Sequence, residues 1–120
     1  MTEMQNSKRY DLEDRTLIFA AKARDYVKRL PNGLTNFEIS KQLFRAAGSV
    51  GANYIEANES LSRKDFILRV KISRKEAKEA RYWLKLSEPK EPDIALKNAL
   101  IQESTELMKI FGAILEKVKS

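Results

Sequence analysis

The chain has 120 residues, 42% of them hydrophobic and 33% charged, and this composition predicts one small helical domain over residues 1–120. It has no Cys and no His, which excludes disulfides, thiol or imidazole catalysis and Cys/His zinc sites. The 23 Lys and Arg exceed the 17 Asp and Glu, and the net charge of +6 favours polyanionic partners. No apolar run is long enough for a membrane span and no signal-peptide pattern is present, so we expect a cytoplasmic protein.

The first stretch of the chain, before Pro31, carries apolar and small residues at helical spacing. It predicts a helix over residues 11–30 with Asp11 as its N-cap. The predicted buried stripe is Leu12, Thr16, Phe19, Ala23, Tyr26 and Leu30. Pro31, Asn32 and Gly33 are typical of a turn and should end this helix.

The middle of the chain predicts two helices, over residues 36–59 and 63–88, because its apolar stripe changes phase between them. Each begins at a capping box, Thr35 with Glu38 and Ser62 with Asp65. The first stripe is Leu43, Ala47, Val50, Tyr54, Ala57 and Leu61. The second stripe is Phe66, Val70, Ser73, Ala77, Ala80 and Leu84.

A fourth helix is predicted over residues 93–118, after Pro89 and Pro92. Its apolar residues form two adjoining stripes, which contain Leu100, Leu107, Phe111, Ile114 and Val118 beside Ile101, Met108 and Leu115. Four amphipathic helices joined by short connections predict an all-α fold, an antiparallel up-down-up-down four-helix bundle.

Most of the excess positive charge lies on the helix predicted over residues 63–88. On a helical wheel, eight of its nine basic residues lie about 60° to 180° from the core stripe. These are Arg63, Lys64, Lys71, Arg74, Lys75, Lys78, Arg81 and Lys85. The acidic residues Asp65, Glu76 and Glu79 lie in the opposite arc. This separation predicts a strip that binds phosphates, with Tyr82 placed to stack on a base; a merely solvated charged face is the alternative.

An apolar patch on the same helix faces neither the core stripe nor the basic arc. It consists of Leu68, Ile72, Trp83 and Leu86. Apolar side chains at such positions usually mark a partner surface, so the patch predicts a homo-oligomer. The alternative is that this helix lies more centrally in the bundle than the wheel assumes.

A segment rich in small residues occupies residues 45–60, with the sequence RAAGSVGANYIEANES. Glycines inside a helix are destabilising, so Gly48 and Gly51 predict close helix contacts. Together with residues 66–84, FILRVKISRKEAKEARYWL, this segment resembles the bacterial four-helix-bundle family encoded by intervening sequences in 23S rRNA genes. Residues 11–16, DLEDRT, and 39–43, ISKQL, are similar to the first two helices of that family, so the resemblance covers about residues 10–88.

The resemblance implies a four-helix bundle that assembles into a ring, expected to be a pentamer. It also implies relatedness to the accessory protein of diversity-generating retroelements. The resemblance implies that such relatives bind nucleic acid through basic surface residues and partner a reverse transcriptase. It implies no catalytic residue, and we expect no cofactor and no metal.

Three functions therefore compete. The first is a non-enzymatic, oligomeric bundle that binds RNA or DNA without sequence specificity through the eight basic residues. The second is a protein-interaction scaffold whose basic face meets an acidic protein, with a reverse transcriptase as one candidate partner and no direct nucleic-acid binding. The third, least favoured, is a carboxylate-metal enzyme built on Glu56 with Glu59 or Glu76 with Glu79, each pair sharing one helix face.

Overall fold

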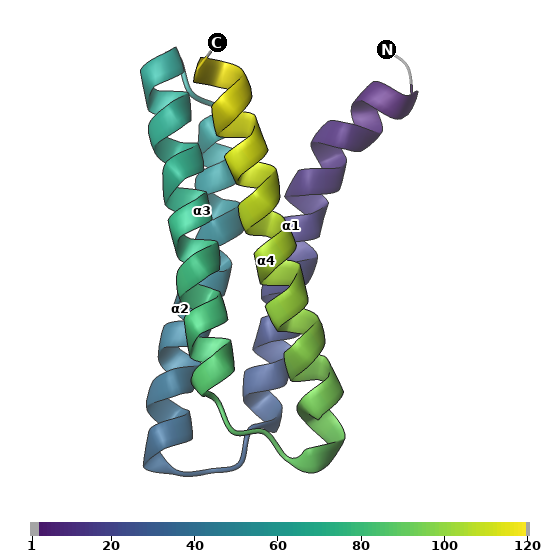
Figure 1. The fold of residues 1–120 in the computed structure, drawn as a ribbon, viewed down its shortest axis with the longest axis vertical. Coiled ribbons are helices and arrows are strands. Elements are labelled where there is room, and N and C mark those ends of the chain that lie inside the picture. The colour runs from purple at the N-terminus through teal and green to yellow at the C-terminus, as the bar shows by residue number, and fades with distance from the viewer. Residues whose placement is uncertain (1–2, 120) are drawn as a thin grey trace.

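The computed structural model describes residues 3–119, and the side chains of residues 12–119. Four long helices, α1 (Glu3–Arg29), α2 (Leu34–Asn58), α3 (Arg63–Leu86) and α4 (Ile94–Lys119), alternate in direction along one axis (Figure 1). A short 3-10 turn, η1 (Glu91–Asp93), precedes α4. The described residues contain no strand, and the predicted all-α, antiparallel four-helix bundle is confirmed.

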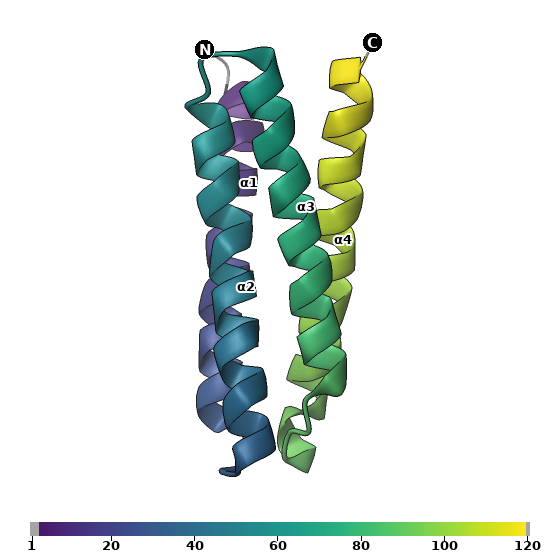
Figure 2. The ribbon, with the colours of Figure 1, turned by 90° about the vertical axis from the view of Figure 1, so that its left-hand side faces the viewer.

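The helices pack mainly against their neighbours in the chain. α2 contacts both α1 and α3, α3 also packs along α4, and the contact between α1 and α4 that closes the bundle is much smaller. The view turned by 90° shows α1 and α2 on one side and α3 and α4 on the other (Figure 2). α3 therefore has two long seams, one with α2 and one with α4.

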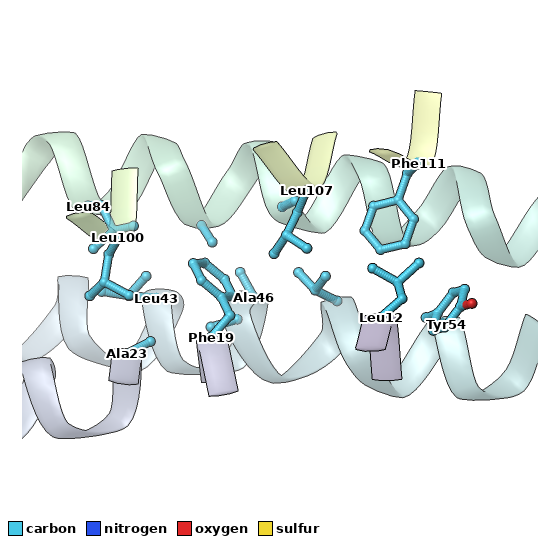
Figure 3. Close-up of a cluster of buried hydrophobic side chains, with 14 of the residues drawn as sticks. Leu12, Phe19, Ala23, Leu43, Ala46, Tyr54, Leu84, Leu100, Leu107 and Phe111 are labelled. Carbon is cyan, nitrogen blue, oxygen red and sulfur yellow. The ribbon is translucent and has the colours of Figure 1, made fainter. Parts of the chain in front are cut away.

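The predicted stripes of α1, α2 and α3 form the core together with four of the eight residues predicted on α4: Leu100, Leu107, Phe111 and Leu115. All six residues of the α1 stripe are buried, as are five of the six in each of the stripes of α2 and α3. Phe19, Leu43, Leu84 and Leu107, one from each helix, lie within the same cluster (Figure 3). The two exceptions occur at the α2–α3 connection, where Leu61 is fully exposed in the loop and Phe66 is half-buried. Continuing the stripe to Leu61 was wrong, because α2 has already ended at Asn58.

The helix ends follow the sequence signals at one capping box and depart from them at the other. Ser62 caps α3 as predicted, since its hydroxyl accepts the Asp65 amide at 3.1 Å. The cap predicted at Thr35 is wrong, because α2 begins at Leu34 and its N-cap is Gly33. Gly33 has a φ of +152°, a backbone conformation that residues with a Cβ rarely adopt.

The other ends lie within a few residues of the predictions, except at the start of the chain. α1 begins at Glu3, well before the predicted N-cap Asp11, whose side chain lies outside the described residues. Like α1 and α2, α3 ends slightly earlier than predicted, at Leu86, where the amide of Ser87 donates to two carbonyl oxygens of the last turn. α4 begins at Ile94 and reaches Lys119.

Small and polar residues set how closely the helices approach one another. A Cβ placed on Gly51 would lie 2.8 Å from the Thr16 hydroxyl oxygen, so α1 and α2 touch there, as predicted. Gly48 faces open space instead, and the close contact predicted for it is absent from the described residues. Between α2 and α3, the buried Ser73 hydroxyl donates to the Val50 carbonyl at 2.9 Å.

One polar contact joins α1 to the end of α3. The hydroxyl oxygens of Tyr26 and Ser87 lie 2.5 Å apart inside the bundle. Ser87 donates its proton to the Leu84 carbonyl at 2.6 Å, so Tyr26 donates to Ser87. Burial raises the pKa of Tyr26, which keeps its hydroxyl protonated as a donor.

Candidate nucleic-acid interface

The eight predicted basic residues lie along one face of α3, which borders α4 from Lys71 to Arg81, and we call them the basic strip. They are Arg63, Lys64, Lys71, Arg74, Lys75, Lys78, Arg81 and Lys85. Seven are exposed and Arg81 is half-buried. Two contacts place the strip at the seam: Arg81 Nη1 donates to Thr105 Oγ1 of α4 at 3.1 Å, and a Cβ on Gly112 of α4 would lie 3.8 Å from Cζ of Arg74.

Two of the three acidic residues of α3, Glu76 and Glu79, face its other seam and are held by one arginine of α2. Arg45 Nη1 donates to Glu76 Oε2 at 3.1 Å, and its Nη2 pairs with Glu79. Glu76 is only 7% exposed, and Trp83 Nε1 donates to Glu79 Oε2 at 3.1 Å. The Trp83 hydrogen bond, together with Arg45, lowers the pKa of Glu79, and both carboxylates raise the pKa of Arg45. These two carboxylates are therefore occupied within the bundle, on the side away from the strip.

The strip itself carries almost no internal neutralisation. Within residues 12–119, none of its eight side chains lies within 4.0 Å of a carboxylate oxygen. Arg81 is bound to a neutral hydroxyl, and Lys75 only lowers the pKa of Glu79 from a distance. A row of like charges left without counter-charges attracts anions, and a salt-sensitive interaction with a polyanion would neutralise it.

A groove of about 590 Å³ runs between α3 and α4 beside the strip, and we call it the α3–α4 groove. Four strip residues line it: Lys71, Arg74, Lys75 and Lys78. Its less exposed lining is apolar and comes from both helices: Ile67, Met108, Gly112 and Leu115. Glu116 and Lys119 of α4 complete the lining and pair with each other at 3.8 Å. The sequence analysis did not predict that α4 lines this groove. The helical wheel of α3 does not show which face of a neighbouring helix lies beside it.

The remaining strip residues do not line this groove. Arg63 and Lys64 lie in the first turn of α3, and Arg81 and Lys85 lie near its end. Tyr82 is 60% exposed, as its predicted role in stacking requires, and its ring packs edge-on against Trp83 with centroids 5.1 Å apart. The strip is thus continuous along α3, and its middle section borders a concave surface.

Comparison with known proteins gives the family. The sequence profile described as 23S rRNA-intervening sequence protein matches residues 8–112. The chain belongs to this family. A crystal structure of a protein of unknown function from the S23 ribosomal protein family of Bacteroides thetaiotaomicron VPI-5482 is similar, with 34% sequence identity and a TM-score of 0.74. The match covers 86% of this chain and 96% of that one. No curated protein matches the chain.

In this family member, the apolar patch predicted on α3 is only partly exposed. Leu68 is 54% and Leu86 is 50% exposed, whereas Ile72 and Trp83 are half-buried. Trp83 packs against the core. The sequence analysis missed other exposed apolar side chains on α1 and α2: Leu17, Phe37, Phe44 and Ile55. The exposed Gly48 was the available signal for the part of this surface on α2, since none of the described atoms lies within 4 Å of a Cβ placed there.

The third predicted function gains no support from the acidic side chains. Glu76 and Glu79 bind Arg45, and Glu56 and Glu59 are exposed. Among the described residues, no group of three or more acidic side chains is placed to hold a metal ion. Over the same part of the chain, no helix has the length and apolarity of a membrane span.

Proposed function

We propose that this family member is a non-enzymatic bundle that binds RNA or DNA through the basic strip, without sequence specificity. The observation that carries the proposal is the separation of charge on α3. Glu76 and Glu79 are bound by Arg45, while seven of the eight strip residues are exposed and none of the eight pairs with a carboxylate within residues 12–119. Like charges at i,i+3 and i,i+4 spacing disfavour the isolated helix, so a phosphate backbone is the ligand that relieves them.

Salt dependence tests this function directly. Each lysine that neutralises a phosphate releases a counterion, and this lowers log K by about 0.7 to 0.9 per tenfold rise in salt. Replacing Lys71, Lys75 and Lys78 with Gln should reduce the slope of log K against log salt by about 2 to 3. It should weaken the binding of all nucleic acids by about the same factor. Filter binding of single- and double-stranded RNA and DNA over a salt series gives both quantities.

A matched control uses three exposed lysines away from the strip. Replacing Lys22, Lys28 and Lys90 with Gln removes the same charge from α1 and the loop before η1. This control should keep most of the affinity and the slope. Equal losses in the two triple variants would assign binding to net charge alone and refute the role of the strip.

The proposed working form is a homo-oligomer. Leu68 and Leu86 are half-exposed leucines on one outer face of α3, and a second copy of the chain would cover them. The ring of five that the family resemblance implies would have about five times the 13.8 kDa mass of one chain. Sedimentation at equilibrium measures that mass, and a value equal to one chain contradicts the proposal.

A second candidate is a scaffold for a protein partner, such as the reverse transcriptase of a retroelement. The exposed aromatic side chains of Phe37 and Phe44 on α2 favour it, because they are 60% and 50% exposed and lie away from the basic strip. Recovery of one stoichiometric protein after nuclease treatment, lost on replacing Phe37 and Phe44 with Ser, would support this candidate over direct nucleic-acid binding.

A further inference from the structure

The α3–α4 groove differs from the rest of the basic strip because its floor is apolar. Ile67 and Met108 are half-buried there and Leu115 is almost fully buried, beneath the exposed lysines of α3. A surface that only tracks phosphates needs positive charge and gains nothing from a concave apolar floor. The groove therefore suits a ligand that is anionic on one side and apolar on the other.

Gly112, which has no side chain, lets Arg74 lie close to the floor of this groove. A Cβ at this position would meet nothing closer than Arg74, whose Cζ and Nε lie 3.8 and 3.9 Å away. The guanidinium of Arg74 thus lies within van der Waals distance of a Cβ at Gly112, at the floor of the groove. Guanidinium groups stack on nucleic-acid bases, and their charge also binds phosphate.

The size and length of the groove fit a short stretch of nucleic acid. Its volume of about 590 Å³ lies in the range of roughly 300 to 1,000 Å³ usual for ligand sites. Lys71 and Lys78 are seven residues apart on α3, about 10 Å at 1.5 Å per residue. That distance corresponds to about three phosphates of a stacked strand at 3.4 Å each.

We infer that the α3–α4 groove binds unpaired nucleotides, with bases on the apolar floor and phosphates on Lys71, Lys75 and Lys78. In a duplex the base faces are stacked inside the helix, so only a single strand can place a base on Ile67 and Met108. The inference rests on the proposed nucleic-acid-binding function and narrows it to single-stranded ligands.

Two oligonucleotides of equal charge separate base binding from phosphate binding. A fluorescent oligothymidylate carries bases, whereas an abasic oligodeoxynucleotide of the same length carries only sugars and phosphates. The wild-type chain should bind the oligothymidylate about fivefold or more tightly in fluorescence anisotropy, since each stacked base adds affinity. Equal affinities would overturn the inference, and so would equally tight binding of a polyglutamate of the same charge.

A substitution that fills the groove tests its location without changing charge. Gly112→Leu puts a side chain over the floor and should reduce the preference for bases to about one, while abasic binding stays near the wild-type value. Ala113→Leu is the matched control, because Ala113 is the exposed neighbour of Gly112 and does not line the groove. It should keep the preference. A Gly112→Leu variant with an unchanged preference, and with wild-type helix content by circular dichroism, would place base binding elsewhere.

The outcomes also distinguish this inference from the function beneath it. Suppose that the Lys71, Lys75 and Lys78 variant loses binding while the wild-type chain binds both oligonucleotides with equal affinity. The proposed nucleic-acid binding is then supported, and the groove does not bind bases. If the wild-type chain binds neither oligonucleotide even at low salt, the proposed function itself fails.

Discussion

Two glycines of α2, three residues apart, have opposite surroundings. Gly51 is buried against Thr16 of α1, and a Cβ there would lie 2.8 Å from the threonine oxygen. Gly48 is exposed, and a Cβ there would meet nothing within 4 Å. The same residue type is thus required for packing at one position and, within a single chain, costs helix stability at the other.

We expect Gly51→Ala and Gly48→Ala to change stability in opposite directions. Overpacking at Gly51 should cost about 1 to 3 kcal/mol and outweigh the gain in helix propensity of about 1 kcal/mol. Gly48→Ala should stabilise the protein by about 1 kcal/mol, because it gains helix propensity and meets no neighbouring atom. Urea unfolding of both variants checks this, and equal stabilities would mean that α1 does not approach α2 closely at Gly51.

Arg45 reinforces the orientation that the buried face gives to α3. It is anchored to the buried Glu76 and to Glu79, which lie on the side of α3 away from the basic strip. Rotation of α3 about its axis would separate these charges and leave a buried carboxylate without its partner, which is strongly unfavourable. The direction in which the lysines point is therefore fixed on the opposite seam.

At the level of helices, the two capping boxes of the sequence make unequal contributions. Ser62 accepts the Asp65 amide, so Ser62→Ala should destabilise the protein by about 1 kcal/mol. Thr35 lies within α2, whose N-cap is Gly33, so Thr35→Ala should change stability by less than about 0.5 kcal/mol. Thermal unfolding compares the two, and a larger loss for Thr35→Ala would contradict this assignment.

Helical periodicity was sufficient to predict most of the fold. The buried faces of α1, α2 and α3 and the break between the last two follow from the spacing of apolar residues, because each helix buries the face that carries them. Thr35 and Glu38 did not mark the start of α2, because Gly33 is the N-cap and the helix begins at Leu34. Gly33 can end the preceding turn there because its φ of +152° is rarely open to other residues. Leu61 has the right spacing for the core, but α2 has ended before it.

The candidate site was predictable only in part. The segregation of lysines on α3 was visible in its sequence, since one helix determines its own faces. The groove also needs Met108, Gly112 and Leu115, and their position beside α3 depends on how α4 is rotated and displaced in the bundle. Arg45 was missed for the same reason, because its partners belong to another helix.

At the level of the whole molecule, the choice of surface for self-association can be tested. We expect the double variant Leu68→Glu and Leu86→Glu to separate the assembly into single chains, because it places two charges in the proposed apolar contact. Sedimentation in the absence of nucleic acid should then give the 13.8 kDa of one chain. The control changes Asn98 and Gln102, exposed polar residues of α4, to Glu.

An alternative contact is tested in the same experiment. Phe44 and Ile55 are exposed on α2, on either side of Gly48 in the sequence. If their replacement by Glu separates the chains and that of Leu68 and Leu86 does not, the predicted interface on α3 is wrong. Self-association would then use the glycine-bearing face of α2.

The length of α3 has a consequence for stoichiometry. From Arg63 to Lys85 the basic strip spans 22 helical steps, about 33 Å at 1.5 Å per residue. A stacked strand rising about 3.4 Å per nucleotide would lie along the whole of it with about ten nucleotides. Each chain should therefore occlude a site of about that size. A long polynucleotide of any sequence should then be saturated at about one chain per ten nucleotides.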